Sequence, residues 1–277
     1  MQVTGSSHRD VLSQVDAEAR AARVSKTSYR LALDITPGSA TYHGDVTIAF
    51  DLTGRGSLFL DYRGKTIERL EANGQVIAAP EWTGYRLTIP GEALREGANE
   101  LHIVYENDYD HSGDGFHQFT DPEDGEEYLY TNFEPYESHR LFPQFDQPDI
   151  KASYSLTVTA PSHWELVANS RETGRTEAGG GRSTWTFETT KPFSTYLFAL
   201  VVGPYHVARE KHGDIDVGLF CRKSLAKPAK ATHSFITAGA TDKSNRPSDG
   251  SATNQRGNLP CELPLAPITP DTATNKR

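Results

Sequence analysis

The sequence predicts an all-β fold, a sandwich or saddle of short, mostly antiparallel strands, with a short N-terminal helix and a disordered C-terminal tail. Apolar and polar residues alternate with a period of two over many short runs, as they do in half-buried strands. Turn-forming residues separate these runs, among them 23 glycines and 16 prolines. Only one stretch has a helical composition. This combination is typical of two-layer β architectures.

The helical stretch covers residues 11–24 and is rich in Ala, Glu and Arg. Asp10 stands before it and is a plausible N-cap. The apolar residues of the stretch are small and sparse. We therefore expect residues 1–25 to form a short surface helix or a leader.

The second expected unit is a β-domain over residues 26–226. The predicted strands in it are 29–35, 46–52, 58–62, 66–71, 76–78, 85–89, 101–105, 128–133, 152–160, 165–168, 183–189, 196–202 and 215–221. Asn73-Gly74 predicts a tight turn, and residues 179–181, three glycines, predict a flexible hairpin tip. Residues 107–127 are dense in Gly, Asp and Glu, which favours a long loop, and residues 134–141 favour a helical turn.

The third expected unit is the tail, residues 227–277. Its composition shifts to Thr, Ala, Pro, Asn and Ser, and no hydrophobic period is sustained. Such a stretch buries too little apolar surface to offset the conformational entropy lost on folding. We expect it to have low order, and to be an out-of-frame segment or a truncated start of another domain.

Charge and composition exclude several classes of function. Acidic residues outnumber basic residues by 37 to 28, for a net charge of −9. A nucleic-acid binder would show a basic surface, and an anionic membrane would repel this chain. The longest apolar run, residues 196–203, is far shorter than the roughly 20 residues of a membrane span. No secretory signal is visible, and two cysteines, Cys221 and Cys261, form no disulfide framework, so we expect a cytoplasmic protein.

Residue spacing alone identifies no catalytic site. The acidic residues of 108–127 could hold calcium, but position twelve of a loop counted from Asp108 is Phe119 instead of the required glutamate, which favours a solvated loop. The histidines show no i,i+4 pair, although a metal site assembled from distant strands stays open. Nucleophile elbows and phosphate-binding loops are absent from the sequence, and nothing fixes a carboxylate pair.

The run from 128 to 161 suggests a rigid platform. A predicted strand brings Glu134 to the start of a turn. Two aromatic-proline clusters follow, Phe142-Pro143 and Phe145-Asp146-Gln147-Pro148, and they would fix the backbone through proline φ and anchored rings. The alternative is a proline-braced corner between two sheets.

Motifs along residues 18–226 resemble the N-terminal domain of the aminopeptidase N family of zinc metallopeptidases, in the form common in bacteria. The matching segments are Glu18-Ala19-Arg20-Ala21-Ala22-Arg23-Val24, Gly115-Phe116-His117, Asp121-Pro122, Asp124-Gly125, Tyr128-Leu129-Tyr130-Thr131-Asn132-Phe133-Glu134-Pro135, Phe145-Asp146-Gln147-Pro148-Asp149-Ile150-Lys151-Ala152, Pro192-Phe193-Ser194-Thr195-Tyr196-Leu197-Phe198-Ala199 and Gly203-Pro204-Tyr205.

The resemblance implies an activity that this chain cannot complete. In that family the active site lies in the following domain, which needs a GxMEN strand and an HExxH helix that binds zinc. The only methionine here is Met1, and no histidine is followed by glutamate. The resemblance therefore implies zinc in the intact enzyme, but we expect this chain to bind none, to hold no catalytic residue and to be inactive alone. A truncated, frameshifted or deliberately shortened chain would explain this.

The resemblance also implies a substrate-binding pair. In the family, this segment supplies an acceptor for the free α-amine of the peptide substrate, and the matching residue is Glu134, with Asn132 in place of the usual glutamine. It further implies a cis peptide bond after Glu134. Arg140, Asp146 and Asp149 are expected to make structural or interdomain contacts. The expected partner is a peptide N-terminus, and the sequence does not indicate an oligomeric state.

Two alternatives from other classes remain open at this point. The first is a stand-alone, non-catalytic β-sandwich that binds or scaffolds a partner. The second is an independent hydrolase that uses the acidic loop.

Overall fold

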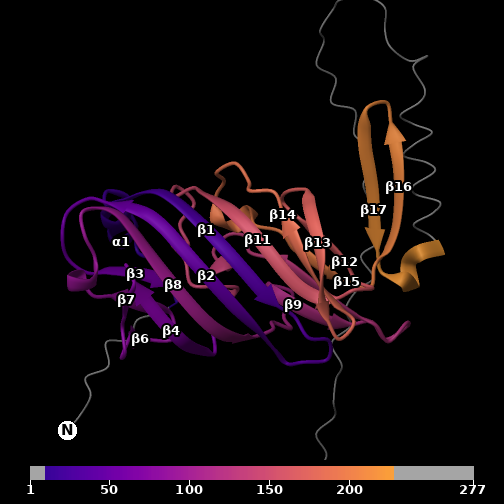
Figure 1. The fold of residues 1–277 in the computed structure, drawn as a ribbon, viewed down its shortest axis with the longest axis horizontal. Helices are drawn as coiled ribbons and strands as arrows, with labels where there is room; N and C mark the ends of the chain where they lie inside the picture. Colours follow the sequence, from indigo (N-terminus) through magenta and orange to yellow (C-terminus); the bar gives the residue numbers. More distant parts are fainter. Residues whose placement is uncertain (1–9, 228–277) are drawn as a thin grey trace, which may run out of the picture.

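An eight-stranded sheet forms the body of the molecule (Figure 1), in the order β13-β14-β11-β1-β2-β8-β4-β5. The computed structural model describes residues 10–227. All neighbours in this sheet pair antiparallel except β1 and β11, which pair parallel from Thr27↔Ala152 onward. The strands are β1 (Val24–Asp34), β2 (Thr41–Leu52), β4 (Thr66–Ala72), β5 (Gln75–Val76), β8 (Gly97–Asp108), β11 (Ala152–Pro161), β13 (Glu172–Gly179) and β14 (Arg182–Phe187).

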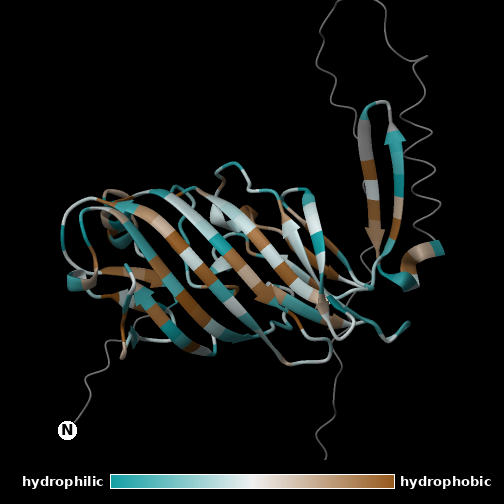
Figure 2. Cartoon of the chain, in the orientation of Figure 1, coloured by the Kyte–Doolittle hydropathy of each residue, from teal (hydrophilic) through white to brown (hydrophobic). Residues whose placement is uncertain are grey.

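The two faces of this sheet differ because its strands alternate in polarity (Figure 2). In β1, Tyr29, Leu31 and Leu33 are buried, whereas Arg30 and Asp34 between and after them are exposed. Antiparallel sheets commonly bury one face and expose the other to water in this way. The predicted period of two is thus confirmed, and it places the core on one side of the sheet.

Two smaller sheets cover the buried face. One has the order β12-β15-β10-β9 and the other the order β3-β7-β6. Phe116 of β9 packs on Tyr42 of β2 with ring centroids 5.3 Å apart, and Tyr62, just after β3, packs on Tyr105 of β8 at 5.5 Å. The all-β sandwich is therefore confirmed. The strands are β3 (Leu58–Asp61), β6 (Glu81–Trp82), β7 (Arg86–Ile89), β9 (Gly115–Thr120), β10 (Glu127–Asn132), β12 (Glu165–Ala168) and β15 (Leu200–Gly203).

The N-terminal helix α1 (Gln14–Ala21) is shorter than predicted, and its cap differs. Ser13 is the N-cap, and its side chain accepts a hydrogen bond from the backbone N–H of Asp16 at 3.2 Å. The prediction of Asp10 as the cap is wrong, because the Asp10 carboxylate contacts Arg63 and His139 instead. Arg20 of α1 is buried. The helix is therefore attached to the β-domain by its own side chains.

Two local predictions were wrong. The expected loop 107–127 contains strand β9, which pairs with β10 in a hairpin. The expected strand 196–202 begins as a short 3₁₀ helix, η3 (Thr195–Leu197), so that β15 starts only at Leu200. In both cases the fold overrides a weak local pattern. The helical turn expected at 134–141 is present: the N–H of Glu137 donates to the backbone oxygen of Phe133 at 3.1 Å, and a 3₁₀ helix, η2 (Ser138–Arg140), follows.

A hairpin of β16 (His206–His212) and β17 (Ile215–Cys221) stands away from the sheets (Figure 1). After it the chain returns to the β-domain and forms a last 3₁₀ helix, η4 (Lys223–Leu225). The predicted tail lies outside the described residues, except for Lys227. In the part of the chain from 10 to 227, no helix is long and apolar enough to cross a bilayer.

Candidate functional site

Asn132 lies at the open end of the β9–β10 hairpin, where it pairs with Gly115. Its side-chain Nδ2 donates hydrogen bonds to the backbone oxygen of Gly113 and to Oδ1 of Asp114, both at 3.2 Å. Asn132 is itself exposed. Its amide thus fixes the loop before β9 against the end of β10.

Glu134 lies two residues after Asn132, at the start of the turn that leaves β10. Its side chain is exposed, and within residues 10–227 its carboxylate has neither a hydrogen bond nor an ion pair. The Glu134–Pro135 peptide bond is cis, as the resemblance implied. An unpaired carboxylate on the surface can accept charge-assisted hydrogen bonds from a cation.

The turn that carries Glu134 is fixed by a chain of charged side chains. Arg140 pairs with Glu137, three residues before it, and its Nη1 lies 2.9 Å from Oδ1 of Asp110. Asp110 Oδ2 also accepts a hydrogen bond from the N–H of Phe116 in β9. Burial raises the pKa of Glu137, although the positive charge of Arg140 opposes the shift. The expectation of a structural role for Arg140 fits these contacts.

His139 forms a buried ionic bridge beneath the same turn. Its Nδ1 donates to Oδ2 of Asp146 at 2.8 Å and its Nε2 donates to Oδ1 of Asp10 at 3.0 Å. Although burial opposes it, hydrogen bonds to Asp10 and Asp146 raise the pKa of His139 to about 9. Asp146 is also held by Thr195, whose Oγ1 donates to Oδ1 at 2.6 Å. The imidazolium and Asp146 together therefore connect residues 10, 139–146 and 195, which lie far apart in the sequence.

A second buried ion pair extends this network to α1. Nη1 of Arg20 lies 2.6 Å from Oδ2 of Asp61, and its Nε donates to Oε1 of Gln147 at 3.0 Å. The N–H of Asp146 also donates to Asp61, at 3.0 Å. Residues 141–147 are all buried. The two aromatic-proline clusters thus lie in a buried segment, and the rigid platform stays a prediction.

Sequence reasoning missed most of this network. The charged contacts of Asp10, Asp61, Glu137 and His139 were not predicted, because their partners lie between 3 and 129 residues away and no motif marks them. Asp149 is exposed. The signal that could have found the network is the number of polar residues placed between aromatic residues in 133–147.

The acidic residues of 108–127 do not converge on one point. Asp108 faces Lys65, Asp110 faces Arg140, and Glu127 accepts a hydrogen bond from the N–H of Gly38. Asp121 and Asp124 contact residues 222–224. Within residues 10–227, no three side chains of His, Cys, Asp or Glu are grouped as ligands for a metal ion. The carboxylates are therefore used as structural acceptors across the fold.

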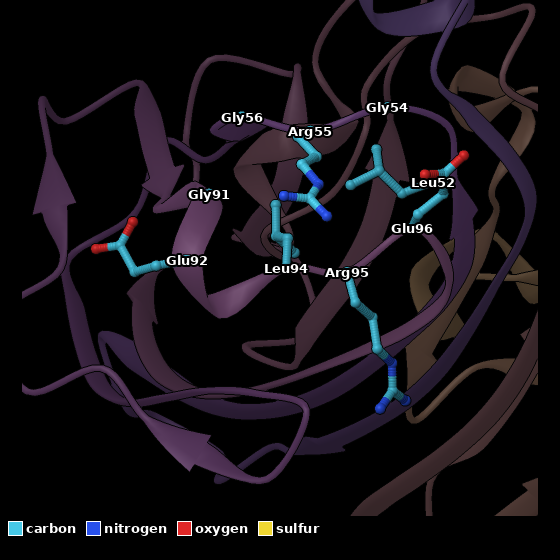
Figure 3. Close-up of a pocket in the computed structure, with 9 residues that line it drawn as sticks. All are labelled: Leu52, Gly54, Arg55, Gly56, Gly91, Glu92, Leu94, Arg95 and Glu96. Atoms are coloured by element: carbon cyan, nitrogen blue, oxygen red, sulfur yellow. The ribbon is translucent and has the colours of Figure 1, made fainter.

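A separate hollow of about 320 Å³ lies between the loop after β2 and the 3₁₀ helix η1 (Gly91–Ala93). Figure 3 shows Arg55 reaching toward Leu94, whereas Glu92 and Arg95 point away from each other. None of its lining residues comes from β9, β10 or η2. The hollow is therefore not part of the Glu134 site.

Comparison with known proteins identifies the family. The family described as the peptidase M1 N-terminal domain matches residues 25–197. An aminopeptidase N of Streptomyces lividans is 36% identical over 232 residues, which cover 81% of this chain and 26% of that protein. A probable M1 family aminopeptidase 1 of Encephalitozoon cuniculi is 34% identical over 144 residues, 50% of this chain and 16% of its own length.

An aminopeptidase N of Acetobacter pasteurianus is 35% identical over 113 residues, which cover 40% of this chain and 32% of that protein. The chain thus spans about a third or less of the length of these curated relatives.

Proposed function

Because this chain belongs to the peptidase M1 N-terminal domain family, we propose that it is the substrate-anchoring β-domain of an aminopeptidase, in which Glu134 binds the free α-ammonium group of a peptide. The proposal includes Asn132 as a second substrate-binding residue and a cytoplasmic location. Removal of N-terminal residues from peptides belongs to the intact enzyme, and this chain is inactive alone.

The observation that carries the proposal is the state of the Glu134 carboxylate. It is exposed and unpaired within residues 10–227, while the turn beneath it is held by the buried His139–Asp146 pair and the half-buried Arg140–Asp110 pair. A carboxylate on a fixed turn binds a cation without the entropy cost of ordering a mobile loop. A charge-assisted hydrogen bond of this kind contributes about 1.5–3 kcal/mol.

Anchoring the α-amine supports exopeptidase specificity. A fixed contact to the N-terminus sets which peptide bond reaches the catalytic groups, because orientation converts binding into a defined register. An N-acylated peptide lacks the positive charge and loses the contact. Discrimination against blocked N-termini is therefore the property that Glu134 supplies.

The family resemblance implies zinc, but residues 10–227 do not fit it, because they contain no group of three metal ligands. In this proposal the zinc ligands belong to a part of the intact enzyme outside these residues.

A second candidate function is a stand-alone binding module without catalysis. The same free carboxylate supports it, because ammonium binding needs no metal. The two proposals differ in the expected affinity. An anchoring domain supplies one of several contacts of a composite site, so it should bind a cationic ligand with a millimolar Kd on its own. A stand-alone binding module requires a micromolar Kd.

The test is a nuclear magnetic resonance titration of the ¹⁵N-labelled chain with L-leucinamide and with N-acetyl-L-leucinamide. We expect the cationic ligand to shift amide resonances of residues 132–137, and the acetylated ligand to leave them in place. The variant Glu134→Gln should weaken binding of leucinamide at least tenfold.

Glu92→Gln is the matched control, because Glu92 is also exposed and the charge change is the same. Equal perturbation by both ligands, or equal affinity of the E134Q and E92Q chains, would remove Glu134 from the site. Tight, micromolar binding would favour the stand-alone module.

A further inference from the structure

The acidic turn between β9 and β10 holds the segment that follows the projecting hairpin. Oδ2 of Asp121 accepts hydrogen bonds from Nη1 of Arg222 at 2.9 Å and from Oγ of Ser224 at 2.6 Å. Oδ2 of Asp124 accepts the N–H of Ser224 at 3.0 Å, and Oη of Tyr128 accepts the N–H of Lys223 at 2.9 Å. Successive backbone and side-chain donors of one segment are thus bound by one turn.

The acceptors of this turn are also held by hydrogen bonds within the turn itself. Oδ1 of Asp121 accepts the N–H of Glu123, and Oδ1 of Asp124 accepts the N–H of Glu126. The hydroxyl of Tyr128 donates to Oδ2 of Asp124 at 2.9 Å. Each carboxylate therefore shapes the turn with one oxygen and contacts the segment with the other.

The Asp121–Arg222 ion pair is largely shielded from solvent on its acidic side. The side chain of Asp121 is 2% exposed and that of Arg222 is 34% exposed. The guanidinium of Arg222 also lies 4.9 Å from the ring centroid of Phe119 in β9. Removal of one partner from a buried charge pair costs more than removal of a surface pair, because the other charge stays desolvated.

The neighbouring hairpin meets the β-domain near its two ends and through the exposed Arg209–Glu165 pair, in which Nη2 and Oε2 lie 3.3 Å apart. Its first strand follows Tyr205, whose ring packs on Tyr128 with centroids 4.9 Å apart, and its second strand ends at Cys221, next to Arg222. Between these ends it stands away from the sheets (Figure 1). Both ends of the hairpin thus meet the β-domain at Tyr128 and the acidic turn.

We propose that the acidic turn, with Asp121, Asp124 and Tyr128 as acceptors, is a docking site for the chain's own segment Arg222–Ser224, and that this contact sets the direction of the β16–β17 hairpin. β10 begins at Glu127, beside the turn, and ends at Asn132, beside Glu134. The docking site therefore fixes the hairpin relative to the strand that leads to Glu134. The proposal does not depend on the role of Glu134.

Two measurements on the full chain test the docking site. Amide hydrogen exchange at Lys223 and Ser224 should be at least tenfold slower than in an unstructured peptide of residues 219–227. In Asp121→Asn, exchange at both amides and tryptic cleavage after Arg222 and Lys223 should rise at least tenfold. Ser224→Ala, which alters the segment and leaves the turn intact, should raise both rates two- to fivefold.

Glu123→Gln is the matched control, because Glu123 lies in the same turn and is exposed, and its hydrogen bond goes to Asp121 instead of to residues 222–224. Its rates should equal those of the wild type. Exchange at Ile48 in β2 reports global unfolding and should be unchanged in all variants. The proposal is overturned if the wild-type amides exchange at the peptide rate, if D121N matches E123Q, or if Ile48 accelerates together with residues 223 and 224.

Discussion

Nε2 of His139 lies 3.0 Å from Oδ1 of Asp10, and this contact joins the segment before α1 to the turn that presents Glu134. The other ring nitrogen is bound by Asp146, so the imidazolium is neutralised on both sides. The charge of a single buried histidine therefore affects both the N-terminal segment and the candidate site.

His139 should make stability depend on pH. Its folded-state pKa of about 9 lies above the unfolded value of 6.5, so its contribution is fully present below pH 6.5 and is lost as pH rises through 9. The shift corresponds to about 3 kcal/mol. Urea unfolding at pH 6, 8 and 9.5 measures the loss. His139→Gln should be less stable than the wild type at pH 6, and its free energy of unfolding should change much less between pH 6 and pH 9.5. An unchanged pH dependence in this variant would assign the effect to other groups.

Removal of Arg20 should destabilise the fold strongly. Asp61 would remain buried without its cation, at a cost of about 3–5 kcal/mol. Arg20→Met is the variant, and its unfolding midpoint in urea is the measurement. Arg30→Met is the control, because the Arg30–Glu100 pair is exposed and contributes less than about 1 kcal/mol. Similar losses in both variants would contradict a dominant role for the buried pair.

Gly115 should tolerate alanine poorly. Its φ is +74°, in the left-handed region that favours glycine. A Cβ at this position would lie 1.9 Å from Oδ2 of Asp110. Gly115→Ala should therefore disturb the Asp110–Arg140 contact and cost about 2–3 kcal/mol. Gly125→Ala separates the two effects, because Gly125 has φ +71 with open space around it. Its cost should be only the backbone penalty of about 1 kcal/mol.

The purified chain should not hydrolyse aminoacyl-anilides, with or without added zinc, because its sequence lacks the HExxH zinc helix and residues 10–227 contain no group of metal ligands. Release of the chromogenic amine by spectrophotometry is the measurement, with an active aminopeptidase as the positive control. Turnover that a chelator abolishes and zinc restores would refute the expectation of an inactive chain.

The sequence predicts regular strands well and long-range polar contacts poorly. β2 and β11 stand out because each buries every second side chain, and that period is local information. β9 was missed because Gly115 and the surrounding acidic residues resemble a loop, although pairing with β10 makes it a strand. β16, with the sequence HVAREKH, has almost no alternation to detect.

The candidate site shows the same division. Glu134 and the cis bond after it came from the family resemblance, and the structure adds that the carboxylate is exposed. The support beneath it depends on pairs such as Asp10–His139, which are 129 residues apart. Only the three-dimensional fold brings such groups together, so composition and spacing could not indicate them.

The parallel pairing of β1 with β11 has a consequence for synthesis on the ribosome. Thr27 pairs with Ala152, so the partner edge of β1 is made 125 residues after β1 itself. At about 5–20 residues per second, the nascent chain carries this unpaired edge for about 6–25 seconds. An open edge with one apolar face is a template for pairing with other chains. Protection of the nascent β1–β2 hairpin until β11 has been made should therefore raise the yield of folded protein.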